Sequence, residues 1–226
     1  GPHMMEQERW NSVDVYFSSL LVKEDEALSK AAQAHREFDL PDLAVSAPQG
    51  KLLHLLARLR QARRILEIGT FGGYSSIWLA RALPPDGRLV TIEWERSFAE
   101  SAASRLAEAG VAHLVEQHVG RALDILPTLD RPGTAPFDMV FVDANKPDIP
   151  EYFTWALKLS RPGAVVVVDN VVLGGAVTDP DHPDAGVQGV RRFHEMLAGR
   201  SDVTATSIQT VGTKGYDGFT LALVTG

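Results

Sequence analysis

Residues 65–76 read ILEIGTFGGYSS, an apolar run that enters a glycine-rich turn and then the start of a helix. Glycines let the backbone approach a ligand closely, and the first N–H groups of a helix are free to bind one. The spacing is G-x-x-G-G rather than the G-x-G-x-x-G of dinucleotide-binding proteins, and Glu67 precedes it. This carboxylate would repel a diphosphate but attract a sulfonium. The stretch therefore favours a site for S-adenosylmethionine over one for NAD, with a plain tight turn as the alternative.

A second acidic residue supports the cofactor interpretation. Glu93 ends the next apolar run, RLVTIE, 26 positions after Glu67 (93 − 67). A carboxylate at that strand tip is placed to accept both hydroxyls of a ribose, as the acidic residue of a dinucleotide fingerprint does. The alternative for Glu93 is a solvated charge at the end of a strand.

The order of apolar segments predicts the fold. Helix-like stretches at 95–108 and 150–160 separate short runs that are apolar at consecutive positions, as in strands covered on both faces. These runs are RILEI, RLVTIE, FDMVFVD and AVVVVD. Near the end, VTATSIQT and FTLALV are separated only by VGTKGYDG, which is too short for a crossover helix. We expect a seven-stranded, mostly parallel Rossmann-like α/β sheet with a C-terminal antiparallel strand pair and helices on both faces.

The remaining chain organisation follows from periodicity and composition. Residues 5–60 have helical spacing and predict an N-terminal cap, interrupted by a loop at LPDLAVSAPQG, and residues 61–226 form the sheet core of the same single domain. Residues 1–4 resemble a remnant of tag removal, with Met5 as the native start. The segment 171–188, rich in Gly, Pro and Asp, predicts a loop over the site that helps to choose the substrate.

Two further strand ends carry oxygen ligands. Asp143 ends FDMVFVD, and Asp169 with Asn170 ends AVVVVDN. Two carboxylates and an amide at neighbouring strand tips suit Mg²⁺, Mn²⁺ or Ca²⁺ and leave positions open for a substrate. Lys146 is close enough in sequence to reach a hydroxyl bound there and to help form a phenolate. The alternatives are helix or turn capping for the first three residues and an ordinary surface lysine for the last.

The composition excludes several classes of partner and of chemistry. The net charge of −7 offers no basic surface for nucleic acid, and the absence of cysteine excludes disulfides, thiolate metal sites and a cysteine nucleophile. No window is apolar enough for a membrane span, so we expect a soluble, cytoplasmic protein. The histidines lack a metal-ligand spacing and are expected to be ordinary surface or partly buried residues.

Together these motifs resemble the cation-dependent class I O-methyltransferases, the family of catechol and caffeoyl-CoA O-methyltransferases, over nearly the whole chain. The resemblance implies that Glu67, Gly69 and Ser75 hold the amino acid end of S-adenosylmethionine, that Glu93 holds its ribose, and that Val45 and Ala122 are further contacts. Thr70, Phe71 and Asp143 are counted with the same cofactor site. The family's metal ligands fall on Asp143, Asp169 and Asn170, with Mg²⁺ expected, and its proposed general base falls on Lys146.

One residue departs from the family pattern. Many caffeoyl-CoA-type members read D-A-D-K where this chain has Asn145 before Lys146, which leaves the acceptor open within phenolic small molecules. Asp217 in the closing hairpin matches a recurrent aspartate that we interpret as turn-stabilising. The resemblance also implies a homodimer. A nicotinamide-dependent reductase and a non-catalytic cofactor-binding protein are the alternative functions; the first lacks its fingerprint, and the second would be expected to lack the metal and base residues.

Overall fold

The sheet is built from seven strands within residues 2–226, the part that the computed structural model describes, with side chains from residue 5. Their spatial order is β3-β2-β1-β4-β5-β7-β6. The first five are mutually parallel, while β7 runs antiparallel to both β5 and β6. The bounds are β1 Arg64–Ile68, β2 Arg88–Glu93, β3 Val115–Val119, β4 Phe137–Val142, β5 Ser160–Asp169, β6 Val203–Gly212 and β7 Gly215–Val224. The predicted fold class is confirmed.

Apolar cores lie on both faces of the sheet. Along β4, Met139 and Phe141 face one core while Val140 and Val142 face the other, because successive side chains of a strand point to opposite sides. This burial on both faces explains why the strands read as continuous apolar runs rather than alternating ones.

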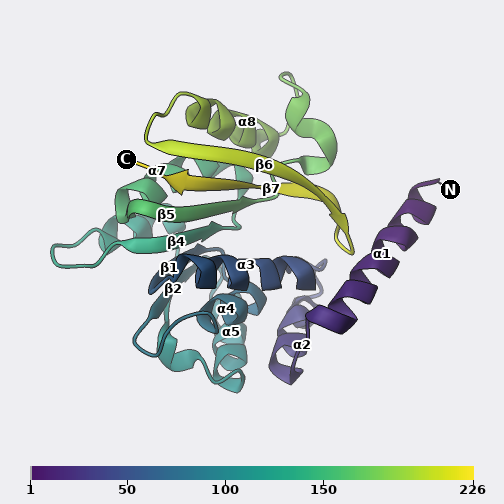
Figure 1. Cartoon of the computed structure of the whole chain (residues 1–226). Coiled ribbons are helices and arrows are strands. Elements are labelled where there is room, and N and C mark those ends of the chain that lie inside the picture. Colours follow the sequence, from purple (N-terminus) through teal and green to yellow (C-terminus); the bar gives the residue numbers. More distant parts are fainter. Residues whose placement is uncertain (1) are drawn as a thin grey trace.

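Helices cover the two faces (Figure 1). Helices α2 and α3 of the cap, with α4 and α5, pack on one face, and α7 with α8 pack on the other. The α-helices are α1 Pro2–Leu21, α2 Glu26–Ala32, α3 Ala47–Arg60, α4 Tyr74–Ala80, α5 Arg96–Glu108, α6 Ala122–Ile125, α7 Ile149–Leu159 and α8 Ala185–Ala198. Short 3₁₀ turns are η1 Ala34–Phe38, η2 Ala112–Leu114, η3 Leu126–Leu129, η4 Lys146–Asp148 and η5 Leu173–Thr178.

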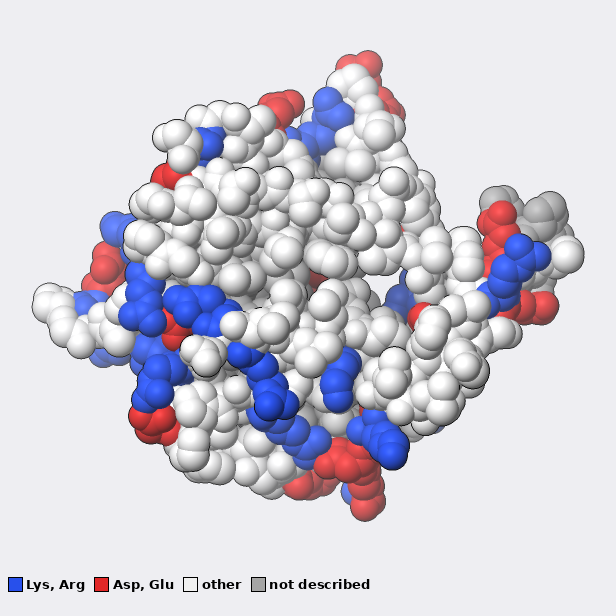
Figure 2. All heavy atoms as spheres, viewed as in Figure 1, with Lys and Arg blue, Asp and Glu red and all other residues white. Residues whose placement is uncertain are grey.

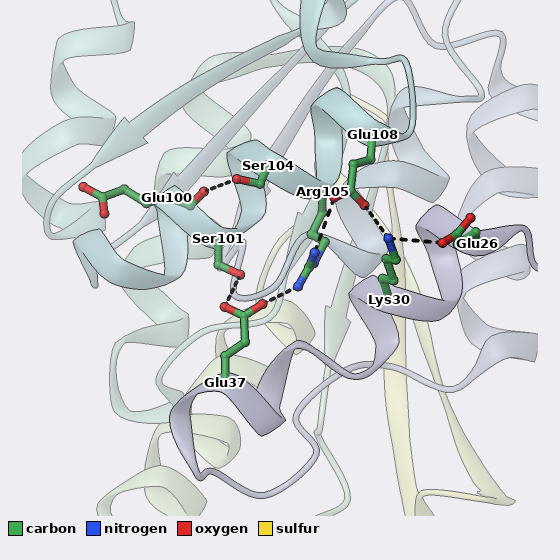
Figure 3. Close-up of polar contacts among 8 residues, drawn as sticks. All are labelled: Glu26, Lys30, Glu37, Glu100, Ser101, Ser104, Arg105 and Glu108. Carbon is green, nitrogen blue, oxygen red and sulfur yellow. Dashed lines mark hydrogen bonds and ion pairs between the residues drawn. The ribbon is translucent and has the colours of Figure 1, made fainter.

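The cap is fixed to α5 by a polar network (Figure 3). Glu37 of η1 pairs with Arg105 and accepts a hydrogen bond from Ser101 at 3.1 Å, while Lys30 of α2 lies 3.8 Å from Glu108. Exposed ion pairs of this kind contribute about 0–1 kcal/mol each. The aromatic contacts of Phe38 and Phe71 with Phe98 and the buried apolar residues of α2 and α3 therefore supply most of the attachment.

Helix α1 projects to the side of the sheet and meets the tip of the β6–β7 hairpin (Figure 1). Gln7 donates to the Gly212 carbonyl at 2.9 Å, and Asp14 accepts from the Thr213 backbone N–H at 2.9 Å. Among residues 2–226, no helix is long and apolar enough to cross a membrane. On the face shown in Figure 2, the surface over β6 and β7 is largely uncharged. Lys and Arg side chains gather in the lower part of the same view, around α3, α4 and α5.

Several predicted boundaries are corrected. The closing strands extend to Gly212 and Gly215, so their turn is much tighter than the predicted VGTKGYDG. Helix α3 begins at Ala47 and includes Pro48, because the first helical turn needs no N–H donor from proline. The last part of the predicted loop 171–188 is the first turn of α8, which Asp184 caps. Of the predicted tag remnant, residues 1–4, Gly1 lies outside the described residues.

Candidate functional site

A cavity of about 1300 Å³ opens at the carboxyl ends of the parallel strands. The strand order reverses between β1 and β4, and open α/β sheets bind ligands at such a point. The walls come from the strand ends, from the cap segment 42–49 and from the hairpin segment 210–215. Single-ligand pockets usually measure about 300–1000 Å³, so this cavity has room for two ligands side by side.

The glycine-rich turn forms the cavity floor. Gly69 has φ +104°, and a Cβ there would overlap the Asp143 carbonyl oxygen, so the tips of β1 and β4 touch only because residue 69 is glycine. Phe71 also has a positive φ, +45°. Its backbone N–H donates to Glu93 Oε1 at 2.7 Å, which holds this strained turn against the end of β2.

Glu67 lies behind the turn rather than in the cavity. It is fully buried and accepts hydrogen bonds from Ser75 at 2.6 Å, from Thr91 at 2.8 Å and from Ser76. Burial raises the pKa of Glu67 to about 7, while these three hydroxyl donors act in the opposite direction. The carboxyl therefore joins β1, β2 and α4 beneath the turn, and its predicted contact with the cofactor stays a prediction.

The other predicted cofactor residues divide into two groups. Thr70 and Ser75 are buried beside Glu67, and Thr70 shares a 2.5 Å hydrogen bond with Thr91. The residues that do line the cavity are Val45, Gly69, Phe71, Glu93, Ala122 and Asp143. Burial raises the pKa of Glu93, whose two oxygens accept hydrogen bonds from the backbone N–H groups of Phe71 and Glu95.

Aromatic and cationic residues that the sequence interpretation missed complete this end. Trp94, Phe98 and Arg121 line the cavity, and the Arg121 guanidinium lies 5.8 Å from the centre of the Trp94 ring. Trp94 directly follows Glu93, so its position after a strand tip was the available signal. A flat ring and a guanidinium at this place suit the adenine end of a nucleoside.

The structure brings the predicted cation ligands together. Asp143 follows β4 and Asp169 ends β5, two adjacent parallel strands, and both line the cavity. Burial, and next the Asp143 carboxylate, raise the pKa of Asp169 to about 7; Gln49, the backbone at Asn170 and Lys146 oppose this rise. Burial also raises the pKa of Asp143. Two carboxylates that repel each other in a cavity form a place for positive charge.

Asn170 is oriented by its loop. Its φ of +60° turns the chain sharply after β5. Its Nδ2 donates to Asp217 Oδ2 at 3.3 Å, while Asp217 Oδ1 accepts from the backbone N–H groups of Val172 at 3.1 Å and Leu173 at 3.2 Å. Asp217 thus holds the turn, in agreement with its interpretation from sequence. The same contact engages the amide nitrogen of Asn170 rather than its oxygen.

Lys146 stands beside the same carboxylates. Its Nζ lies 3.9 Å from Asp143 Oδ1 and donates to the Ala144 carbonyl at 2.8 Å. The backbone of Lys146 is packed against α8, where a Cβ at Gly189 would overlap the Lys146 carbonyl oxygen. A small residue in α8 therefore fixes where the lysine leaves the main chain.

The departure at Asn145 has a local explanation. Tyr152 donates its hydroxyl hydrogen to Asn145 Oδ1, and Asn145 Nδ2 donates to Asp148 Oδ2 at 2.5 Å. Unlike a carboxylate, an amide offers both an acceptor to the tyrosine and a donor to the aspartate. A carboxylate at position 145 would face Asp148 without a hydrogen to donate, so the amide suits this neighbourhood better.

The donor set was compared with what a divalent cation needs. Within the described residues, no group of three or more His, Cys, Asp and Glu side chains could hold a metal. The predicted set has two carboxylates and one amide, which is hard-oxygen chemistry suited to Mg²⁺ and unsuited to zinc. The chain's residues therefore fit a divalent cation that keeps open positions. The segment 171–188, predicted to lie over the site, does not line the cavity.

Comparisons with known proteins agree with this architecture. A model of the O-methyltransferase family matches residues 18–224. A catechol O-methyltransferase of Niastella koreensis is 49% identical over 220 residues, which cover 97% of this chain and 100% of that protein. One of Mycobacterium tuberculosis is 51% identical, with 94% of each chain covered. The crystal structure of an O-methyltransferase from Bacillus cereus in complex with SAH has a TM-score of 0.93 at 48% identity, covering 96% of this chain and 99% of that one.

Proposed function

The chain belongs to the O-methyltransferase family and is an S-adenosylmethionine-dependent O-methyltransferase; we propose that it methylates a hydroxyl of a catechol-like small molecule and uses a divalent cation, with Mg²⁺ expected. The observation that carries the proposal is the meeting of the glycine turn of β1 with the carboxylates that follow β4 and end β5 in one cavity. One half of the cavity suits an adenosyl cofactor, and the other suits an acceptor with two neighbouring oxygens.

The cofactor half would position the methyl donor. Glu93 would accept the ribose hydroxyls, while Val45, Gly69, Phe71 and Ala122 would contact the remainder. Glu67, Thr70 and Ser75 would act mainly by holding the turn in shape. Positioning of this kind can supply a large part of the catalytic effect.

In the other half, Asp143, Asp169 and Asn170 would hold the cation. When bound, it would supply a Lewis acid that makes a neighbouring phenol easier to ionise at neutral pH. Lys146 Nζ, in its neutral form, would take the proton from the acceptor hydroxyl; the oxygen then forms the bond to the methyl carbon as the carbon–sulfur bond breaks. The 3.9 Å separation of Lys146 Nζ from Asp143 Oδ1 supports this proposed role.

The first experiment measures methyl transfer. Protein, S-adenosylmethionine and a panel of catechols are incubated with Mg²⁺ and then with a chelator, and methylated product is measured by mass spectrometry. We expect product that disappears with the chelator and returns with added Mg²⁺. Product formation that ignores the chelator would refute the cation role, and an absence of product with every acceptor would support the non-catalytic alternative.

A matched pair of variants tests the proposed base. Lys146→Met is expected to lower kcat by about 100-fold or more, because general acid–base groups contribute about 10²–10⁴-fold. Lys158→Met is the control, since Lys158 lies on α7 and pairs with Asp130 at 3.5 Å on the surface. Equal activity of both variants would remove Lys146 from the mechanism.

The remaining sequence predictions keep their status as proposals. The acceptor is inferred as a phenol with vicinal oxygens because two relatives are named catechol O-methyltransferases. A homodimer, a cytoplasmic location and a lack of nucleic-acid or membrane partners stay predictions. Size-exclusion chromatography with light scattering tests the first of these.

A further inference from the structure

Helix α3 begins with an incomplete capping box. Residues 46–49 read S-A-P-Q, a pattern in which serine caps the helix and the glutamine side chain normally accepts the N–H of that serine. Ser46 Oγ accepts from the Gln49 backbone N–H at 3.3 Å, which is the first half of the motif. Within the described part of the chain, the reciprocal hydrogen bond from the Ser46 N–H to the Gln49 side chain is not formed.

Gln49 instead lines the cavity, as Asp169 does. Its side chain is one of the groups that lower the pKa of the Asp169 carboxyl. Its Nε2 is buried and has no hydrogen-bond partner among residues 2–226. A buried donor left without a partner costs about 1–3 kcal/mol, so such an atom at a functional site calls for an explanation.

Helix α3 is packed tightly against α4. A Cβ at Gly50 would collide with the Trp78 ring, so the two helices already pack at the closest distance that a glycine allows. Leu53 and Ala57 are buried on the same helix against the core of that face. Gln49 is thus presented from a rigid element, the arrangement that holds a functional group accurately.

We propose that Gln49 is a positioning residue that donates its amide N–H to the Asp169 carboxylate and so directs the other carboxylate oxygen toward the divalent cation. The inference rests on the proposed function. It gives the N-terminal cap a part in the cation half of the site, beyond the cofactor contact expected of Val45. Gln49 and Asp169 line the same cavity, and the buried Gln49 Nε2 has no hydrogen-bond partner among residues 2–226.

The test uses Mn²⁺ alone as the probe and the full chain. Gln49→Met keeps the length of the side chain and removes the donor. We expect the Kd for Mn²⁺, measured from the EPR signal of free Mn²⁺, to rise about tenfold, because outer partners of metal ligands typically contribute about 10–100-fold. The EPR line shape of bound Mn²⁺ should also change, while the Kd for S-adenosylhomocysteine stays within about twofold.

Ser46→Ala is the matched control. It removes the side-chain cap of the same helical turn and leaves the Gln49 amide in place. We expect a lower Tm with an unchanged Kd for Mn²⁺. An equal loss of Mn²⁺ affinity in both variants would assign the effect to the helix start and overturn the proposal, as would a Gln49→Met variant that binds Mn²⁺ like the parent.

Failure of the proposed function gives a different result. If the parent protein binds S-adenosylhomocysteine but no Mn²⁺, the cation site itself is wrong and the role of Gln49 falls with it. If the parent binds Mn²⁺ and only the Gln49→Met result is negative, the cation site stands and the positioning role alone is refuted.

Discussion

The two halves of the cavity are built in opposite ways. In the cofactor half, the buried Glu67 carboxyl accepts hydrogen bonds from three hydroxyls, and Glu93 holds the strained turn through the Phe71 N–H. In the proposed cation half, burial and next the Asp143 carboxylate raise the pKa of Asp169, and Gln49 Nε2 has no hydrogen-bond partner among residues 2–226. The carboxyl of the first half is satisfied by protein donors, whereas under the proposed function a cation would offset the charge in the second.

This contrast separates residues that stabilise the fold from residues that the reaction needs. A satisfied buried network stabilises the structure in which it lies, and a partly satisfied one is a liability until its ligand binds. Substitutions in the two halves should therefore change stability in opposite directions. Four measurements test this, beginning with the largest expected effect.

Asp169→Asn should separate activity from stability most clearly. We expect methyl transfer to fall by about 1000-fold, since one fixed electrostatic group at a reacting centre is worth about 10²–10³. The Tm of the metal-free protein should rise by about 3 °C, because one of two repelling carboxylates is neutral; for a chain of this size 1 kcal/mol corresponds to about 2–4 °C. Activity assays and thermal unfolding with chelator measure the two effects.

Asp130→Asn, at a surface position, is the control for that substitution. It should leave both quantities near those of the parent. A metal-free Asp169→Asn protein that is less stable than the parent would contradict the idea that the cation half is under electrostatic strain.

Glu67→Ala should lower the stability of the protein, whereas Asp169→Asn should raise it. Three buried hydroxyls, those of Ser75, Ser76 and Thr91, would lose their acceptor. Each buried group left without a partner costs about 1–3 kcal/mol, and relaxation of the structure recovers part of that cost. We therefore expect the free energy of unfolding to fall by about 3 kcal/mol. Urea denaturation measures it, with Glu67→Gln as the milder variant that keeps an acceptor. Unchanged stability would show that the network is not structural.

The pH dependence of the metal-free protein gives a smaller effect. The pKa of Asp169 is about 7 in the folded chain against an ordinary 3.8, so folding favours its protonated form. Stability from this group is therefore present below about pH 4 and is lost as the pH rises to about 7. In the presence of chelator, we expect the Tm at pH 7.5 to be lower than the Tm at pH 5.5 by roughly a few degrees.

Mg²⁺ and the Asp169→Asn variant isolate that contribution. The cation binds the ionised carboxylate, so added Mg²⁺ should raise Tm more at pH 7.5 than at pH 5.5. The Asn variant should show a weaker pH dependence than the parent in chelator. The same pH dependence in both proteins would place the effect on other groups, of which Glu67, with a pKa of about 7, is the first to consider.

The sequence predicted the parts of this molecule that depend on local rules. Strands buried on both faces appear as apolar runs, and the residues that end them, Glu93, Asp143 and Asp169, reach one cavity because parallel strands end at one edge. Strand β3 was not delimited, because Glu116, Gln117 and His118 leave it partly exposed at the sheet edge.

What could not be predicted depends on packing between distant segments. Glu67 was expected to hold the amino acid end of the cofactor, which stays a prediction; its burial behind the turn depends on the helices packed there. Segment 171–188 was expected over the site, whereas residues 210–215 of the hairpin, which contact α1, line the cavity. Gln49 was overlooked because S-A-P-Q indicates only a helix start, and its proposed second role depends on where α3 packs relative to the strand ends.

The smallest expected effect concerns how well Asn170 is oriented. Asp217→Ala removes the acceptor that holds the Asn170 amide nitrogen and two backbone N–H groups of the following turn. We expect the Mg²⁺ concentration for half-maximal activity to rise about tenfold, in the range seen for outer partners of metal ligands. Titration of activity with Mg²⁺ measures this, and activity at saturating Mg²⁺ should largely recover, because Asn170 itself is still present. Asp217→Asn keeps one acceptor oxygen, so its Mg²⁺ concentration for half-maximal activity should lie between those of the parent and of Asp217→Ala. A Mg²⁺ requirement that does not change in Asp217→Ala would mean that the strained backbone at Asn170 orients the ligand unaided, and that the cation half is more rigid than its contrast with the Glu67 network implies.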